Sequence, residues 1–233
     1  LGENLLNQRW YEGTGDKQDW NGYVKSYVDL GEKLTMFVDL QLRGIDHVIG
    51  GTDAFSRDVS GEHRYLFFNP KAGFNYVPAK GQRAYVSFAR ANREPNRNNF
   101  TDAPEGMEPV HECMRNYEAG YEYKGDRFRG TVNLYLMDYR DQLVLTGQIN
   151  EVGYPVMTNV EDSYRAGIEL IAGAEIFSGL KWSGNLTLSR NRIASFTNYI
   201  DNWDYWADPE NEPYQVVEEL GETDLAFSPA VVA

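Results

Sequence analysis

The sequence predicts an all-β fold, a transmembrane antiparallel β-barrel of which this chain supplies a part, and three observations lead to that prediction. Apolar and polar residues alternate along extended stretches, most clearly over 34–43. Short polar turns at 31–33, 78–81, 124–126 and 178–179 recur roughly every 50 residues. A long loop lies between each turn and the next, and outer-membrane barrels place short turns on one rim and long loops on the other.

The alternation and the turns place eight long strands and the beginning of another. The expected strands are 20–30, 34–46, 64–77, 83–92, 111–123, 127–144, 163–176 and 181–193, and a further strand begins near Thr223. The stretches 1–19, 47–63, 93–110, 145–162 and 194–222 are expected to be loops, because they are polar or carry Gly, Asn, Asp and Pro. The chain would therefore contribute about eight to ten strands to a larger barrel.

The composition argues against several classes of protein. The 233 residues carry a net charge of −13, which disfavours nucleic acid as a partner. No apolar run approaches the roughly 18 residues of a membrane-spanning helix, and a mean hydropathy of −0.56 suits a barrel, whose apolar face is hidden by alternation. Cys113 is the only cysteine, so a disulfide framework is excluded, and we interpret it as an inert residue.

In a barrel the apolar face meets lipid and the polar face lines the lumen. Exchanging the two faces would place charges such as Asp39 and Arg165 in hydrocarbon, at a cost of ~2–4 kcal/mol each near the bilayer midplane. The polar positions are therefore predicted to face the lumen and to contact a ligand or a plug. They are Asp39, Gln41, Arg43, Asn69, Lys71, Asn75, Asn116, Glu118, Asn133, Tyr135, Arg165 and Glu169.

Aromatic residues gather where the strands meet the short turns. Tyr76, Tyr121, Tyr123, Phe128 and Trp182 are examples. They are typical of an aromatic girdle at a bilayer interface, and ordinary β-propensity explains them equally well.

The sequence contains no catalytic constellation, so we expect no enzymatic activity. His47, His63 and His111 lack metal-ligand spacing and could approach one another only in loops. Carboxylate pairs such as Glu118 and Glu122 lie on one strand face, too far apart for glycoside hydrolysis. No cofactor and no metal site is predicted.

Two loop stretches are candidates for binding on the external side. The stretch 90–99 is the densest basic patch, and Arg90, Arg93 and Arg97 could contact an anionic ligand, a plug or lipopolysaccharide phosphates. A loop salt-bridged to neighbouring acids is the alternative. In the second stretch, Trp203, Tyr205 and Trp206 could stack on a sugar, a catechol or a macrocycle, or could pack on one another.

Four stretches, taken in order, resemble a known family. They are Phe68–Gly73, Ser87–Arg97, Tyr135–Leu143, and Asn159-Val160 leading into Ser163–Glu169 with its Gly-x-Glu. Over nearly its whole length the chain resembles the β-barrel domain of TonB-dependent outer-membrane receptors, of the kind common in Bacteroidetes.

The resemblance implies a barrel of around 22 strands with an N-terminal plug in its lumen. It implies a location in the outer membrane of a Gram-negative bacterium, in contact with lipid and lipopolysaccharide. It also implies uptake of a scarce nutrient: a ferric siderophore first, with cobalamin, heme or a glycan as other candidates. Energy would come from the TonB–ExbB–ExbD complex through the plug region, and a surface lipoprotein is a further candidate partner.

Residues 1–233 are expected to form an internal part of a single barrel domain, with the plug and the closing strands outside the sequence. About nine strands would leave two open edges, which lipid does not tolerate, so transport by this piece alone is not expected. Two other hypotheses stay open from the residues themselves. One is a passive channel or adhesin barrel, and the other is a soluble β-sandwich or propeller that binds glycans.

Overall fold

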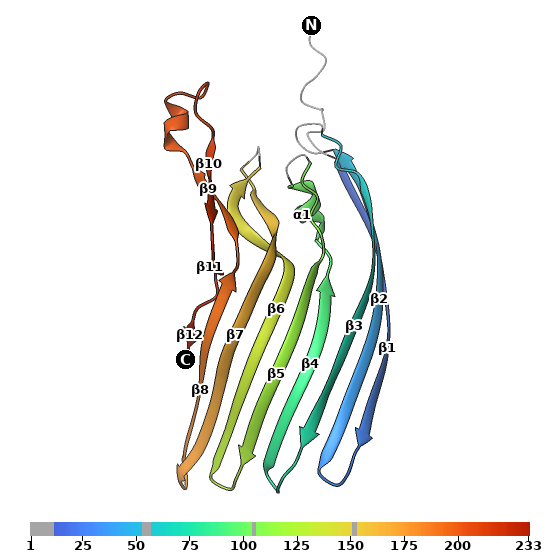
Figure 1. Cartoon of the computed structure of the whole chain (residues 1–233), viewed down its shortest axis with the longest axis vertical. Helices are drawn as coiled ribbons and strands as arrows, with labels where there is room; N and C mark the ends of the chain where they lie inside the picture. The colour runs from blue at the N-terminus through green and yellow to red at the C-terminus, as the bar shows by residue number, and fades with distance from the viewer. Residues whose placement is uncertain (1–11, 53–56, 104–105, 151–152) are drawn as a thin grey trace.

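The computed structural model describes residues 12–52, 57–103, 106–150 and 153–233 and consists mainly of one open antiparallel sheet (Figure 1). Eight long strands follow one another across the sheet in chain order, and two short strands pair with the last of them. The long strands are β1 (Glu12–Asp29), β2 (Leu34–Thr52), β3 (Gly61–Tyr76), β4 (Gln82–Arg93), β5 (Glu112–Lys124), β6 (Phe128–Ile149), β7 (Pro155–Phe177) and β8 (Leu180–Ile193).

The strand register separates an apolar face from a polar face across the whole sheet. Residues paired between antiparallel strands point to the same side, so one row of partners samples one face. Every member of one such row is apolar, and the neighbouring row, displaced by one residue, contains Ser87, Glu118 and Tyr135. The apolar row is Met36, Phe74, Val86, Ala119, Leu134, Ile168 and Leu188.

The apolar face carries no charged residue between the short turns and a belt near mid-strand. Phe128 and Asp138 on β6 are ten residues apart, which at ~3.4 Å per residue and a tilt of about 40° gives a band of about 26 Å. That height matches the roughly 25 Å apolar band of an outer-membrane barrel. We call the first charged residues above the band the outer charged belt: Asp46, Arg64, Arg90, Arg115, Asp138, Asp162 and Arg190.

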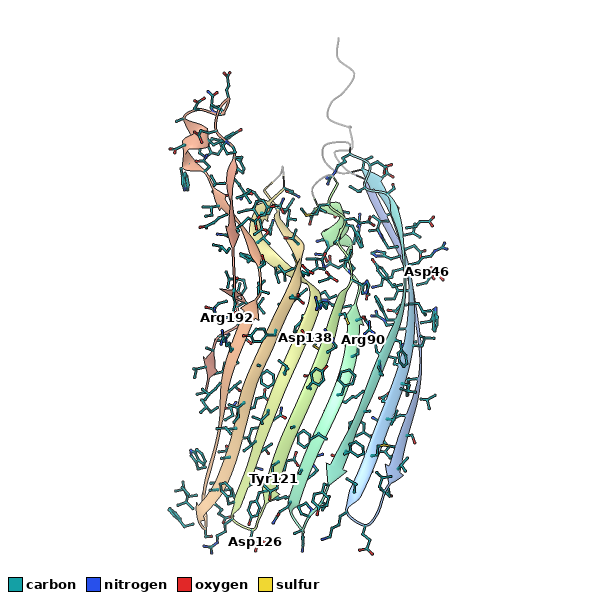
Figure 2. The ribbon with its side chains drawn as sticks, in the orientation of Figure 1. Asp46, Arg90, Tyr121, Asp126, Asp138 and Arg192 are labelled. Carbon is teal, nitrogen blue, oxygen red and sulfur yellow. The ribbon has the colours of Figure 1, made fainter. Side chains whose placement is uncertain are left out.

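Figure 2 places Asp46, Arg90, Asp138 and Arg192 well above Tyr121 and Asp126, which lie at the turn end of the sheet. The apolar side chains between these levels are exposed on the outer surface of the sheet; for example, Leu134 is 52% exposed and Val86 is 50% exposed. Within the described ranges no second sheet covers them, so the structure does not favour the soluble β-sandwich. Among the same residues, no helix combines the length and the apolar character that a membrane crossing needs.

The aromatic residues at the turn end lie on the apolar face. The register aligns Tyr121 with Val132, and Phe128 with Ala174, which in turn aligns with Trp182. Tyr123 contacts Phe128 across the turn, with ring centroids 6.1 Å apart. This placement favours the aromatic girdle over strand propensity alone.

Strands extend into several predicted loops, among them 47–63, where β2 continues to Thr52 and β3 begins at Gly61. The stretch 145–162 was expected to be a loop, but β6 and β7 continue through most of it. The stretch 194–222 contains β9 (Phe196–Asp201) and β10 (Gln215–Leu220), joined through the 3₁₀ helix η2 (Trp203–Trp206). These predictions were wrong because polar residues, Gly, Asn and Pro are typical of loops, whereas pairing with neighbouring segments stabilises these stretches as strands.

A small apolar core supports the strands above the belt. Val144, Val160, Ile193 and Leu225 are buried together, and Phe196 packs against them. Leu225 follows β11 (Thr223–Asp224), which pairs with β8 and corresponds to the predicted strand near Thr223. A second short strand, β12 (Val231–Val232), pairs with β8 further along.

The predicted N-terminal loop 1–19 is shorter than expected, because β1 begins at Glu12. Residues 1–11 lie outside the described residues.

Three aromatic side chains on the polar face lie over glycines of the next strand. Phe37, the exception in the alternation of β2, occupies the space that a Cβ at Gly73 would need. Two further pairs repeat this packing, namely Tyr85 over Gly120 and Tyr135 over Gly167. Because glycine has no side chain, each ring can pack directly on the backbone of the neighbouring strand, on the polar face.

Candidate functional site

All twelve predicted lumen residues lie on the polar face of the sheet. The register links them in short chains, for example Gln41 with Asn69, and Asp39 with Lys71. The same holds for Arg165, which aligns with Met137 and through it with Asn116. The prediction that these positions share one face agrees with the register; their contact with a ligand stays a prediction.

Hydrogen bonds join the side chains of this face within the band. Tyr85 donates from its hydroxyl to Oδ1 of Asn133 at 3.0 Å, and the amide of Asn133 donates to Glu169 at 3.2 Å. Arg83 donates to both carboxylate oxygens of Glu122 and to Asn75. The result is a half-buried surface of amides, carboxylates and guanidinium groups, which can bind polar solutes by hydrogen bonding.

Above the band, the connection between β4 and β5 folds over the polar face. We call the described residues of this segment, 94–103 and 106–111, the inner ledge. It contains one short helix, α1 (Arg97–Thr101), whose N-cap Asn96 forms a capping box with Asn99. Backbone N–H of Asn99 donates to Asn96 at 3.0 Å, and backbone N–H of Asn96 donates to Asn99 at 2.8 Å.

The first anchor of the inner ledge is Glu94, whose carboxylate is buried with only 7% of its side chain exposed. Lys17 of β1 donates to one carboxylate oxygen at 2.6 Å, and Arg43 of β2 donates to the other at 3.0 Å. Arg43 also pairs with Asp19 at 2.5 Å. Burial opposes the charge of Glu94, yet the hydrogen bond from Lys17 and the charge of Arg43 outweigh it and hold its pKa below the usual range.

The second anchor consists of two groups of rings, one with His47 and His63 and the other with His111. His63 stacks on Phe100 of α1 with centroids 3.7 Å apart, and His47 lies 6.4 Å from His63. His111 packs on Phe67 at 5.2 Å. The histidines were expected to meet only in loops; instead two come from β2 and β3, and the third precedes β5 directly.

The electrostatics of the first group favour the neutral forms of His47 and His63. Burial lowers the pKa of His47, and the nearby Lys17 and His63 charges add to that effect. Burial also lowers the pKa of His63, opposed by Glu108, whose carboxylate lies 3.6 Å from Nδ1. Within the part of the chain that the structure describes, no three His, Cys, Asp or Glu side chains converge on a metal position.

The far end of the inner ledge is fixed to β6 and β7. Asn159 accepts from backbone N–H of Val110 at 2.9 Å and donates to its carbonyl at 3.0 Å. The buried carboxylate of Glu112 accepts from backbone N–H of Leu143 at 2.6 Å and from Arg93 at 2.7 Å. The ledge therefore has contacts from β1 at one end to β7 at the other, and its position on the polar face is fixed.

The three arginines of the predicted basic loop do not converge. Arg90 lies in β4, not in the loop, and faces outward in the charged belt. Arg93 pairs with Glu112, and Arg97 lies in α1, with its guanidinium beside Gly13. For Arg93 the salt-bridged alternative agrees with the structure.

The aromatic loop partly packs on itself. Tyr205, Trp206 and Tyr214 form a cluster with centroids 5.2 to 6.2 Å apart. Trp203 stands apart from them and is 80% exposed, while Trp206 remains 69% exposed. Two large rings are therefore left available on the hairpin formed by β9 and β10 (Figure 1).

Residues 94, 100, 112 and 159, which fix the inner ledge, were missed by the sequence analysis. Glu94 and Phe100 lie outside the expected strands, Glu112 lies at the start of the expected strand 111–123, and Asn159 was noted only within a family motif. A usable signal was present, because Glu94-Pro95-Asn96 places a carboxylate and an N-cap residue directly after a strand. Their partners come from strands up to 77 residues away, and no local pattern predicts such contacts.

Comparison with known proteins agrees with this architecture. The family described as TonB dependent receptor-like, beta-barrel, matches residues 3–224. A comparison with curated proteins gives no significant match.

Solved structures share the fold at low sequence identity. The ferric-catecholate import receptor Fiu from E. coli K12 aligns with a TM-score of 0.60 at 15% identity, over 78% of this chain and 29% of that one. The siderophore receptor PiuA from Acinetobacter baumannii gives 0.64 at 15%, over 83% and 28%. The copper transporter OprC gives 0.64 at 15%, over 79% and 32%.

The chain spans about a third of the length of these solved proteins. The family match covers most of the chain, and the segregated faces, the short turns and the open sheet are those of a partial barrel of this class. The chain belongs to the TonB-dependent receptor β-barrel family.

Proposed function

We propose that this chain is part of the barrel wall of an outer-membrane receptor that imports a scarce nutrient actively, in a Gram-negative bacterium. The observation that carries the proposal is the combination of an uninterrupted apolar outer band with a ledge fixed on the polar face. The outer band suits lipid, and a ledge on the inner side narrows the passage and offers it polar groups.

The chain is further proposed to be one portion of a single barrel domain that is completed by strands outside this sequence. In the described sheet, β1 pairs only with β2 and leaves its other edge open. An open edge in lipid leaves backbone groups without partners, so neighbouring strands have to supply them. The plug and the contact with TonB–ExbB–ExbD would also lie outside this sequence. The Bacteroidetes-type assignment rests on the four motif stretches alone.

A ferric siderophore is the cargo we propose. Fiu is named for ferric-catecholate import and PiuA as a siderophore receptor, which supports iron, whereas OprC is named for copper. The exposed rings of Trp203 and Trp206 supply flat apolar surfaces of the kind on which a catechol stacks. The polar face contributes hydrogen-bonding groups and needs no bond chemistry. A surface lipoprotein remains a candidate partner at the external side.

Uptake by the complete receptor tests this proposal. A strain lacking the receptor gene is supplied with radiolabelled ferric siderophores, cobalamin and oligosaccharides, with and without the complementing gene. We expect uptake of a ferric siderophore to return with the gene and to vanish when tonB is deleted. Uptake that persists without TonB would favour a passive channel, and return of cobalamin or glycan uptake alone would reject the proposed cargo.

A further inference from the structure

Two arginines face each other on the outer surface of the wall, at the upper limit of the apolar band. Arg90 of β4 and Arg115 of β5 are direct cross-strand partners. Their side chains point to the apolar face, because Phe88 and Tyr117, two residues below, contact each other there with ring centroids 5.1 Å apart. Like charges directly opposite one another destabilise an antiparallel pair. A bound anion between the two guanidinium groups would remove this repulsion.

The acidic partners of the outer charged belt leave this pair incompletely neutralised. Asp138 is the next residue in the row, and its carboxylate lies 2.8 Å from Arg115. Arg90 is exposed and forms no hydrogen bond or ion pair with any described residue. Other arginines on this face have carboxylate partners of their own: Arg64 lies 3.3 Å from Asp46 and 3.6 Å from Glu62, and Arg140, just above the belt, lies 2.7 Å from Asp162. A net positive charge is therefore concentrated at Arg90 and Arg115, on a chain whose overall charge is −13.

The position of the pair limits what the anion can be. Below the pair, Phe88, Tyr117 and Val86 form part of the apolar band, so an occupant has to offer a phosphate or similar group joined to hydrocarbon. Figure 2 shows Arg90 and Asp138 at a similar level, far from the turn end marked by Tyr121. That level is the external one, because the long connections lie above it and the short turns lie below.

We propose that Arg90 and Arg115 bind a phosphate of lipopolysaccharide in the outer leaflet. Guanidinium groups match phosphate oxygens with paired hydrogen bonds, and two of them at one point exceed what the single Asp138 can neutralise. The acyl chains of the same molecule would lie along Phe88, Tyr117 and Val86. The inference rests on the proposed outer-membrane function and names a lipid contact that import itself does not require.

Native mass spectrometry of the purified complete receptor tests the site. The probes are bisphosphorylated lipid A, the same lipid with its phosphates removed, and inorganic phosphate. We expect R90Q to weaken binding of bisphosphorylated lipid A about fivefold and R90Q/R115Q about 25-fold, since each arginine near a charged surface is worth roughly one such factor. Heat-modifiable migration in gels verifies that each variant is folded.

R140Q is the matched control, because Arg140 lies on the same face and has its own carboxylate partner. We expect R140Q to change binding less than twofold, because an exposed ion pair contributes little free energy. An equal loss in R140Q, or an equal loss with dephosphorylated lipid, would overturn the site. Binding of inorganic phosphate as tight as that of lipid A would assign the pair to a free anion and reject the lipid. Siderophore uptake, measured in parallel, distinguishes this failure from failure of the proposed function.

Discussion

The wall below the outer charged belt and the inner ledge above it are stabilised in different ways. In the wall, each side chain is placed by its parity along a strand, and neighbours such as Leu134 and Ile168 follow from the register alone. In the ledge, a few buried polar groups, Glu94 and Glu112 among them, are satisfied by residues from distant strands. The comparison teaches that the wall tolerates change within a face, whereas the ledge depends on individual residues.

The largest effect is expected from a charge on the apolar face. Val86→Arg places a guanidinium near the middle of the apolar band, whereas Ser87→Arg places it one residue away on the polar face. We expect Val86→Arg to destabilise the complete receptor in lipid by ~2–4 kcal/mol and Ser87→Arg by much less. Urea unfolding in lipid vesicles, followed by tryptophan fluorescence, measures the difference.

Each of the two variants serves as the control for the other, because both substitutions introduce the same side chain. Equal destabilisation by the two variants would contradict the assignment of faces. Greater destabilisation by Ser87→Arg would reverse it.

A smaller effect is expected when the first anchor of the ledge is neutralised. Glu94→Gln keeps the shape of the side chain but removes the charge that Lys17 and Arg43 share. Hydrogen bonds to charged groups are worth about 1.5–3 kcal/mol, so the ledge should open more often while the wall stays intact. Hydrogen exchange of the α1 amides should accelerate by roughly 10- to 100-fold, the range that such an energy implies.

Glu161→Gln serves as the comparison for this variant, because Glu161 is an exposed carboxylate on β7. It should leave exchange in α1 unchanged. If Glu94→Gln accelerates exchange equally in β4 and β5 below the belt, the ledge is not a separate unit of stability.

The smallest effect is expected from pH. His47 and His63 have pKa values lowered by burial beneath Phe100, so their neutral forms are favoured when the ledge is packed. Lys17 and Arg97 oppose protonation of His47, while Glu94 favours it, and Glu108 favours protonation of His63. Packing should be fully stable above the ordinary histidine value of 6.5 and should weaken as the pH falls below it.

Exchange of the α1 amides at pH 7.5 and pH 5.5, corrected for intrinsic rates, measures this dependence. The double variant H47Q/H63Q should remove most of it, because glutamine does not titrate in this range. Opening that strengthens with acid to the same extent in the double variant would assign the effect to other groups. Glu94 does not explain it, because its pKa lies below the usual 4.5.

The sequence predicted the wall well because strand parity is a local property. The alternation in 34–43 and the turns at 78–81 and 124–126 were enough to place β2 to β6 in order. The prediction failed at 47–63, 145–162 and 194–222, where strands continue above the apolar band and polar residues interrupt the alternation. There, pairing between distant segments decides the structure, and composition resembles that of a loop.

The candidate site was predictable only as a face. Asp39, Asn133 and Glu169 lie on the polar side that strand parity predicts, and their contact with a ligand or a plug stays a prediction. The anchors of the ledge were not predictable, because the pairing of Glu94 with Lys17 depends on how a loop folds back. The sequence analysis also did not predict that the side chain of Arg90 points outward, because the strand was expected to end close to this residue.

The rings that lie over glycines have a consequence for how this wall can change over time. Phe37 over Gly73 and Tyr85 over Gly120 join strands that are linked by the longer connections 53–60 and 94–111, whereas Tyr135 over Gly167 joins β6 to β7, whose connection is only residues 150–154. A tight turn sets the alignment of its two strands, but a long connection cannot. Where the connection leaves the alignment open, a ring seated on a glycine defines it. The connections 53–60 and 94–111 therefore do not have to set the strand alignment, and they can gain or lose residues while the wall keeps its register.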